Sequence, residues 1–152
     1  MKLIPFIPTH LDWLEQPYGS ATEDMRNPII NWRDWADKHQ VDGSSFTAID
    51  DQNRIVACGG IMELWKHHGD AWFYGTHLLS KNTISIVKVT RRVMDIIAKN
   101  NEFKRVSTHV LTDWDEAVRF IEFLGFKREG FHQKYGPNET DYYTYGKIYK
   151  EF

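Results

Sequence analysis

One stretch of the chain, residues 72–100, constrains the fold most because its hydrophobic period changes part-way along. Residues 72–79 form a continuous apolar and aromatic run, which predicts a buried strand, and the polar residues 80–83 predict a turn. From Ile84 to about Asn100, apolar residues recur at three- and four-residue spacing, which predicts a helix with one buried face. A strand that turns into a helix exposes the first amide groups of that helix, and such amides can hold phosphate.

The rest of the chain predicts a β-α-α-β-β-β-α-β-α-β-β order in a single domain, residues 1–152. Predicted strands cover 2–6, 45–49, 54–64, 72–79, 105–111, 126–135 and 141–149. Predicted helices cover 10–15, 32–39, 84–100 and 114–124, with caps at Thr9, Asn31 and Asp113, and residues 16–28 predict a loop. Gly59 and Gly60 indicate a bulge or a close approach, and Gly125 a helix C-cap. The fold class is therefore α/β (α+β), a mixed, mostly antiparallel sheet of roughly six to seven strands flanked by about four helices.

Composition excludes several classes of protein. The 152 residues carry a formal net charge of −2, so no basic field points to nucleic acid. A single cysteine, Cys58, rules out an internal disulfide framework and is expected to be inert core in a reducing compartment. No run approaches the roughly 20 apolar residues of a membrane span. We therefore expect a cytoplasmic protein that binds neither nucleic acid nor membrane.

A helix followed by a closing hairpin carries a resemblance to a known family. Residues 117–126 read AVRFIEFLGF, and a turn between two aromatic-rich strands follows. This pattern, with the element order, resembles the GNAT N-acetyltransferase superfamily over about residues 45–149. The spacing from Ala71 to the last hairpin is also similar to small acetyltransferase-like proteins of tailed bacteriophages, one group of which includes an internal virion protein.

The resemblance implies a V-shaped opening between two strands, where acetyl-CoA binds and an amine attacks the thioester directly. It implies that the coenzyme contacts the end of the aromatic strand and the start of the long helix. Those contacts would come from Leu78, Leu79, Lys81, Asn82, Thr83, Ile84, Ser85 and Lys88. The cosubstrate is acetyl-CoA, and no metal is implied.

Two positions depart from the family pattern. The pyrophosphate loop of the family is glycine-rich, whereas residues 81–85 contain no glycine, so an ordinary polar turn is the alternative interpretation. The family often has a proton-donating tyrosine on the later helix, where this chain has Ile121. Tyr135, Tyr142 or Tyr143 could donate the proton in its place, and Tyr143 is the candidate proton donor. Each of the three can equally be a packing residue.

Other polar and aromatic residues are candidates for further roles. Glu63 and His77 are candidate bases for the amine, although either can be an ordinary strand or core residue. His67, His68 and Asp70 adjoin, but adjacent turn residues rarely share a metal, so no metal site is predicted. Three tryptophans either line the acceptor side of the opening or pack helices on the sheet. These are Trp13, Trp32 and Trp35.

Two functions follow from these observations. The first is acetyl transfer from acetyl-CoA to a primary amine on a small molecule or a protein. The second is a catalytically inactive GNAT-fold phage protein, located in the host cytoplasm or virion, with a structural or host-protein-binding role. It is motivated by the missing glycines and by Ile121. A homodimer that pairs through the aromatic-rich final strand is also an expectation.

Overall fold

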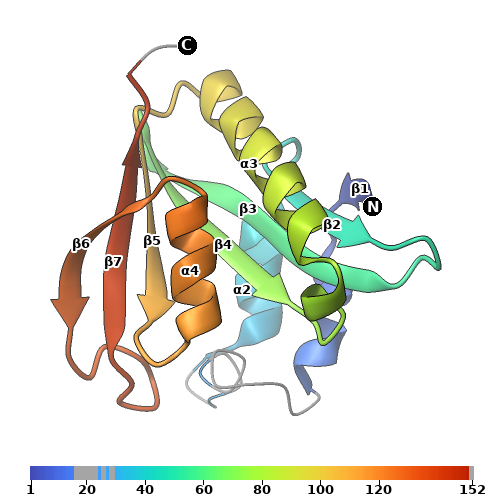
Figure 1. Ribbon diagram of the computed structural model, residues 1–152, viewed down its shortest axis with the longest axis horizontal. Coiled ribbons are helices and arrows are strands. Elements are labelled where there is room, and N and C mark those ends of the chain that lie inside the picture. Colours follow the sequence, from blue (N-terminus) through green and yellow to red (C-terminus); the bar gives the residue numbers. More distant parts are fainter. Residues whose placement is uncertain (16–23, 25–26, 28–29, 151–152) are drawn as a thin grey trace.

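The computed structural model describes residues 1–15, 24, 27 and 30–150 and contains one seven-stranded sheet in the order β1-β2-β3-β4-β5-β7-β6 (Figure 1). The strands are β1 (Lys2–Pro5), β2 (Ser45–Ile49), β3 (Ile55–Trp65), β4 (His68–Gly75), β5 (Arg105–Leu111), β6 (Lys127–His132) and β7 (Tyr142–Ile148). The helical elements are η1 (Pro8–Glu15), α2 (Trp32–His39), η2 (Leu79–Lys81), α3 (Thr83–Asn100) and α4 (Asp115–Phe123). Only the pairing of β4 with β5 is parallel, so the predicted mixed, mostly antiparallel sheet is confirmed.

Helices cover both faces of the sheet. In Figure 1, α3 and α4 lie in front of the sheet and α2 lies behind it. The core between the sheet and α3 and α4 includes Ile97, Ile121 and Tyr145, whereas η1 and α2 pack around Trp72. Because strand side chains alternate between faces, Ala71 and Phe73 of β4 face α3 and α4, and Trp72 and Tyr74 face α2.

Several local predictions are confirmed. Helix α3 ends at Asn100, and Asn31 caps α2 by accepting a hydrogen bond from the Asp34 amide at 3.1 Å. Gly125 follows α4 with a φ of +93°, and the amide of Phe126 returns to the Ile121 carbonyl, as in a Schellman motif. Gly60 marks a close approach, since an added Cβ would lie 2.4 Å from the Ser44 carbonyl oxygen.

Other predicted boundaries are wrong. Residues 8–15 form a 3-10 helix that begins at Pro8, before the predicted cap at Thr9. Helix α4 begins after Trp114, whose amide bonds to the Leu111 carbonyl, so Asp113 is not its N-cap. Strand β6 ends at His132 because the tight return to β7 begins there. The predicted loop 16–28 lies almost wholly outside the described residues.

Strand β4 differs most from its prediction. It begins at His68, not Trp72, because a tight turn with His67 at a φ of +73° returns the chain early. It ends at Gly75, and Leu79 enters η2, where its side chain occupies the space that a Cβ on Gly75 would need. The predicted turn at 66–70 is therefore mostly strand, which places Asp70 inside the sheet.

Three further features bear on the sequence predictions. Both edges of β7 are paired within the chain, with β5 and with β6, so the final strand has no free edge for a second copy, and the homodimer stays a prediction. Burial raises the pKa of the Cys58 thiol to about 12, which confirms that it is an unreactive core residue. Within the part of the chain that the structure describes, no helix is long and apolar enough to cross a membrane.

Candidate functional site

The strands β4 and β5 separate after a short parallel ladder. Their pairing covers only three positions, from His68 with Arg105 to Asp70 with Ser107. Beyond Asp70, β4 stays paired with β3 as far as Gly75, while β5 stays paired with β7 as far as Leu111. The two strands therefore form a fork that opens toward their C-terminal ends, visible in Figure 1 behind α4. The predicted separation of two neighbouring strands is confirmed.

The edge of β4 that faces β5 carries backbone groups beyond the ladder. At the fork, the Ala71 carbonyl oxygen accepts a hydrogen bond from the Thr108 hydroxyl at 2.8 Å, which fixes the direction of this edge. Alternate residues of a strand direct their amide groups to the same edge, so the Phe73 amide also faces the gap. The ladder ends before Phe73. Its N–H is therefore placed to polarise a carbonyl group held in the fork.

Helix α3 begins close to the end of β4 with its first amide groups uncapped by a side chain. The N-cap Asn82 does not cap the helix, because its side-chain amide donates instead to the Leu78 carbonyl at 2.9 Å. The first main-chain bond of the helix runs from the Ile86 amide to the Asn82 carbonyl. The amides of residues 83–85 precede that bond and are the helix-start donors to which phosphate binds in other proteins.

The side chains predicted to contact the coenzyme fall into two groups. Leu78 is buried in the core below α3, Leu79 packs against that core, and Asn82 is half-buried. The remaining five are exposed around the helix start: Lys81, Thr83, Ile84, Ser85 and Lys88. The Thr83 hydroxyl already donates to the carbonyls of Leu79 and Ser80, which leaves Ser85 as the hydroxyl able to turn outward. The exposed lysines and uncapped amides are groups that can attract an anion.

Asp70 lies on the α2 face at the last rung before the fork. Burial raises the pKa of its carboxyl to about 6, and a hydrogen bond from the Ser107 hydroxyl opposes part of that rise. The Ser107 oxygen also lies 2.8 Å from His68 Nε2. Because an ionised carboxylate only accepts, Ser107 donates to Asp70 and accepts from His68. A carboxylate whose pKa lies near neutral pH suits general-base work.

Sequence reasoning missed Asp70 because its neighbours resemble turn residues. The alternation of β4 is the signal that could have identified Asp70, because Asp70, Trp72 and Tyr74 share one face of the strand. The composition of residues 66–70 predicts a turn instead. Tyr74 lies further along that face, and burial together with the nearby Asp70 raises the pKa of its phenol.

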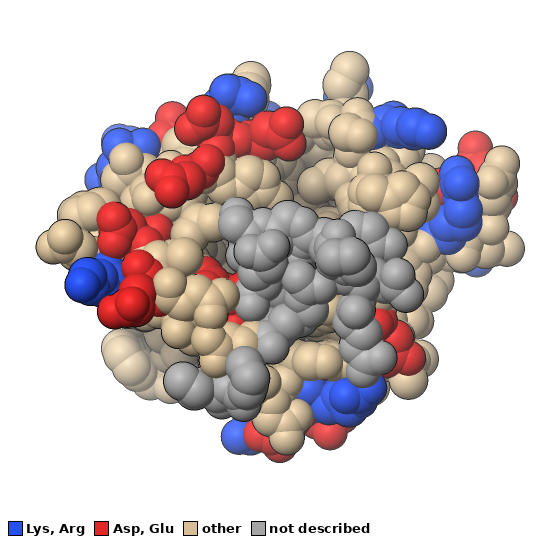
Figure 2. Space-filling view, turned by 90° about the horizontal axis from the view of Figure 1, so that it is seen from below, with Lys and Arg blue, Asp and Glu red and all other residues tan. Residues whose placement is uncertain are grey.

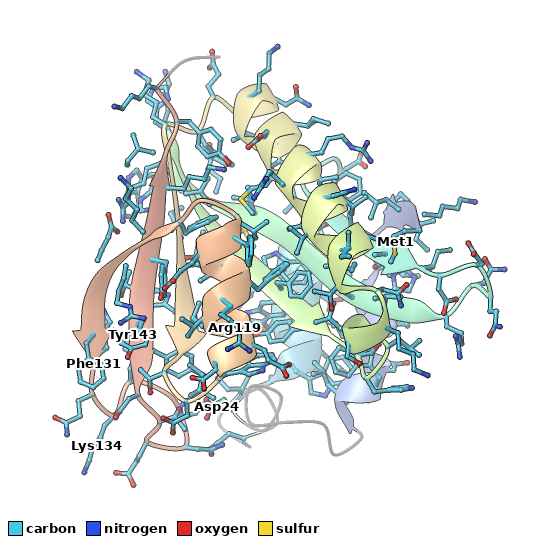
Figure 3. All side chains as sticks on the ribbon, viewed as in Figure 1. Met1, Asp24, Arg119, Phe131, Lys134 and Tyr143 are labelled. Atoms are coloured by element: carbon cyan, nitrogen blue, oxygen red, sulfur yellow. The ribbon has the colours of Figure 1, made fainter. Side chains whose placement is uncertain are left out.

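The three residues predicted to be catalytic do not converge in the fork. Glu63 is exposed and pairs with Gly69, at the end where β3, β4 and β5 are joined. His77 follows β4 and, with Trp13, lines a pocket of about 370 Å³ beside η1. Tyr143 lies on β7 with the Arg128 guanidinium 3.7 Å from its ring centroid. Figure 3 shows Tyr143 beside Phe131, on the far side of β5 from β4.

Helix α4 presents aromatic and aliphatic side chains toward the sheet. Ile121, at the position where the family often has tyrosine, is buried in the core and offers no proton. Its neighbour Phe120 packs on Phe73 of β4, with ring centroids 4.9 Å apart. This pair lies on the same face as α3 and forms an apolar wall near the gap.

The tryptophans of the N-terminal part serve mainly as core. Trp32 is buried, and Trp35 stacks on His39 at 3.8 Å and meets Trp72 edge-on at 5.0 Å. The packing interpretation of these two residues is thus supported, while Trp13 lines the pocket described above. Across residues 1–15, 24, 27 and 30–150, no group of His, Cys, Asp and Glu could hold a metal ion.

Comparison with solved structures identifies the fold. Ard1 from Thermoplasma volcanium has 18% identity and a TM-score of 0.75 over 99% of this chain and 98% of that one. A spermidine N-acetyltransferase SpeG chimera from Vibrio cholerae and hSSAT has 14% identity and a TM-score of 0.73 over 97% and 94%. A GNAT-family acetyltransferase from Bacillus anthracis has 18% identity and a TM-score of 0.67 over 96% and 93%. No family model and no curated sequence matches the chain.

The chain therefore has the fold of the GNAT acetyltransferases over nearly its whole length. The element order, the single parallel pairing and the forked strands agree with the sequence-based resemblance. The narrower resemblance to phage proteins finds no support in these neighbours and stays a prediction.

Proposed function

We propose that this protein is an N-acetyltransferase that moves an acetyl group from acetyl-CoA to a primary amine in the fork between β4 and β5. The observation that carries the proposal is the end of the parallel ladder at Asp70 and Ser107, which leaves the Phe73 amide facing a gap. The similarity to acetyltransferase structures supports the proposal, since those proteins share this fold.

The chemistry requires a base, a carbonyl-polarising donor and close positioning. The neutral amine attacks the thioester carbon, and Asp70 takes the proton that the amine nitrogen loses as the carbon–nitrogen bond forms. The Phe73 N–H stabilises the negative charge that gathers on the carbonyl oxygen. The carbon–sulfur bond breaks, and coenzyme A leaves as a thiolate that then takes a proton from water. Because a thiol has a pKa of about 8.5, its thiolate is a tolerable leaving group. No tyrosine at position 121 is required for this sequence of steps.

The coenzyme would be held by main-chain amides more than by side chains. Its diphosphate would bind the first amides of α3, and Lys81 and Lys88 would add positive charge. Without a glycine in residues 81–85, side chains limit how closely the phosphate approaches, so the loop is degenerate relative to the family. We expect affinity in the micromolar range or weaker.

An inactive GNAT-fold protein, including a phage structural or host-binding component, is the second candidate. The glycine-free loop and the Phe73–Phe120 contact on the wall of the gap favour it. The two functions differ in whether the fork binds acetyl-CoA and turns it over.

Titration calorimetry followed by a thiol-release assay separates the two functions. The proposal predicts one-to-one binding of acetyl-CoA and release of coenzyme A with at least one amine of a panel of small amines and peptide N-termini. The buried Cys58 thiol adds no background to the thiol reagent in the folded protein. Binding that is absent at millimolar acetyl-CoA would leave the inactive candidate.

A further inference from the structure

A buried carboxylate with an unused oxygen lies at the open end of the fork. Asp24 is only 4% exposed. Its Oδ2 accepts hydrogen bonds from the Thr140 hydroxyl at 2.8 Å and from the Tyr142 hydroxyl. Its Oδ1 is equally buried but has no hydrogen-bond partner. Figure 3 shows Asp24 at the lower end of the sheet, where β4 and β5 diverge.

The Oδ2 side of the Asp24 carboxylate is closely packed. A Cβ on Gly136 would lie 3.1 Å from Asp24 Oδ2 and 2.7 Å from the Tyr142 ring, so only glycine fits beside it. Asn27 donates to the Pro137 carbonyl at 3.1 Å and thereby ties the same segment to the β6–β7 loop. Asp24 and Asn27 therefore contact the β6–β7 loop, and Asp24 also contacts the start of β7.

Tyr74 connects this carboxylate with the candidate base. Burial and, after it, the nearby Asp70 and Asp24 carboxylates raise the pKa of the Tyr74 phenol. Burial and the hydrogen bond to Asp24 raise the pKa of Tyr142, whose hydroxyl donates to Asp24 Oδ2. These four groups lie together on the side of the fork opposite α3. The coenzyme diphosphate would bind at the α3 side, so Asp24 and Asp70 face the side from which an acceptor enters.

A buried carboxylate oxygen with no donor is costly unless a ligand supplies one. Burial of an unpaired charge is strongly unfavourable, and cationic N–H donors are its best partners. Within the described residues, no lysine or arginine forms an ion pair with Asp24. The complementary group is a protonated amine that reaches Oδ1.

We propose that Asp24 binds the distal ammonium group of an acceptor that carries two amino groups, while Asp70 receives the proton of the amine that reacts. This inference rests on the proposed function and names its substrate class as a diamine or polyamine. The two carboxylates thus have different tasks, one as the anchor and the other as the base.

The surface at this end of the molecule favours such a cation. Figure 2 looks onto the lower end, where acidic side chains gather on one side of the grey segment. Asp115 and Glu116 at the start of α4 and Glu139 in the β6–β7 loop are exposed. A negative surface raises the local concentration of polycations and repels anionic acceptors.

A matched pair of amines tests the anchor. 1,4-Diaminobutane and butylamine have the same four-carbon chain and differ at one end only, where the diamine carries an amino group in place of a hydrogen atom. We expect kcat/KM for thiol release to be about 10- to 100-fold higher for the diamine, because butylamine lacks the charged hydrogen bond to Asp24. Asp24→Asn should reduce diamine turnover to the level of butylamine. Asp51→Asn, the same change in the exposed β2–β3 turn, should keep the preference.

A binding measurement keeps the test independent of turnover and of the folding of the variant. In calorimetry with wild-type protein and coenzyme A present, the diamine should bind at least 10-fold more tightly than butylamine. Equal affinity or equal turnover of the two amines, or a preference that survives Asp24→Asn, would overturn the anchor. Absence of turnover with every amine would refute the proposed function instead, while preferential diamine binding would still support the anchor.

Discussion

The Thr108 hydroxyl donates to the Ala71 carbonyl at the point where β4 and β5 part. Beyond Asp70 and Ser107 the main chains no longer pair, so a side chain replaces the next ladder bond and satisfies a carbonyl at the root of the fork. This contact ends the ladder without leaving a buried acceptor unpaired. It therefore allows the gap to exist at little cost in stability.

Replacing that hydroxyl should destabilise the fold. Thr108→Val keeps the shape of the side chain but leaves the Ala71 carbonyl without its donor, so we expect a loss of about 1–2 kcal/mol. Chemical denaturation monitored by tryptophan fluorescence measures the change, with an unchanged m value. Thr108→Ser, which keeps the hydroxyl, should lose less. A valine variant as stable as wild type would show that the bond contributes nothing.

The proposed transferase activity should depend on the ionisation of Asp70. Its pKa of about 6 predicts that kcat/KM rises with pH through about 6 as the base loses its proton. Asp70→Asn should lower kcat/KM by about 10²- to 10⁴-fold and remove this acid limb. A pH–rate profile for one amine, corrected for ionisation of the amine itself, measures both effects. If the acid limb of the pH–rate profile persists in Asp70→Asn, the limb belongs to another group.

The same carboxyl should cost stability at neutral pH. A raised pKa means that the folded chain binds more protons than the unfolded chain between about pH 4 and 6, so stability falls as pH rises through that range. Asp70→Asn should therefore be more stable than wild type at pH 8 by about 1–3 kcal/mol, with little difference at pH 4. Urea unfolding at the two pH values measures this. If Asp70→Asn is more stable than wild type by the same amount at both pH values, ionisation of Asp70 is not the cause.

Negative charge at the start of α3 should prevent coenzyme binding. Ser85→Glu places a carboxylate beside the amides of residues 83–85, where it repels a diphosphate. We expect the variant to abolish acetyl-CoA binding in calorimetry. Asn100→Glu adds the same charge at the other end of α3 and should leave affinity unchanged. If Ser85→Glu binds as tightly as wild type, the diphosphate lies elsewhere.

Local signals in the sequence were sufficient for much of the fold. The change of period at Ile84 located α3, Asn31 marked the start of α2, and Gly125 marked the end of α4. Each of these depends on residues within one or two turns of each other. Such interactions can be inferred from spacing alone.

The candidate site depends on contacts between distant residues, which spacing does not reveal. His68 and Asp70 resemble turn residues until Arg105 and Ser107 pair with them to make a rung of a sheet. Asp24 lies within the predicted loop 16–28, and its partner Tyr142 is 118 residues away. Glu63 and His77 were chosen for their chemistry, but neither lies at the root of the fork.

The most direct test of the account follows the amides at the fork by ¹⁵N–¹H NMR during titration with acetyl-CoA. If the fork binds the thioester and α3 binds the diphosphate, the Phe73 amide and those of residues 83–85 should shift together and follow one shared dissociation constant. Amides of the β2–β3 turn at 50–53 should stay in place. Unchanged signals at Phe73 and residues 83–85 with millimolar acetyl-CoA would contradict the account.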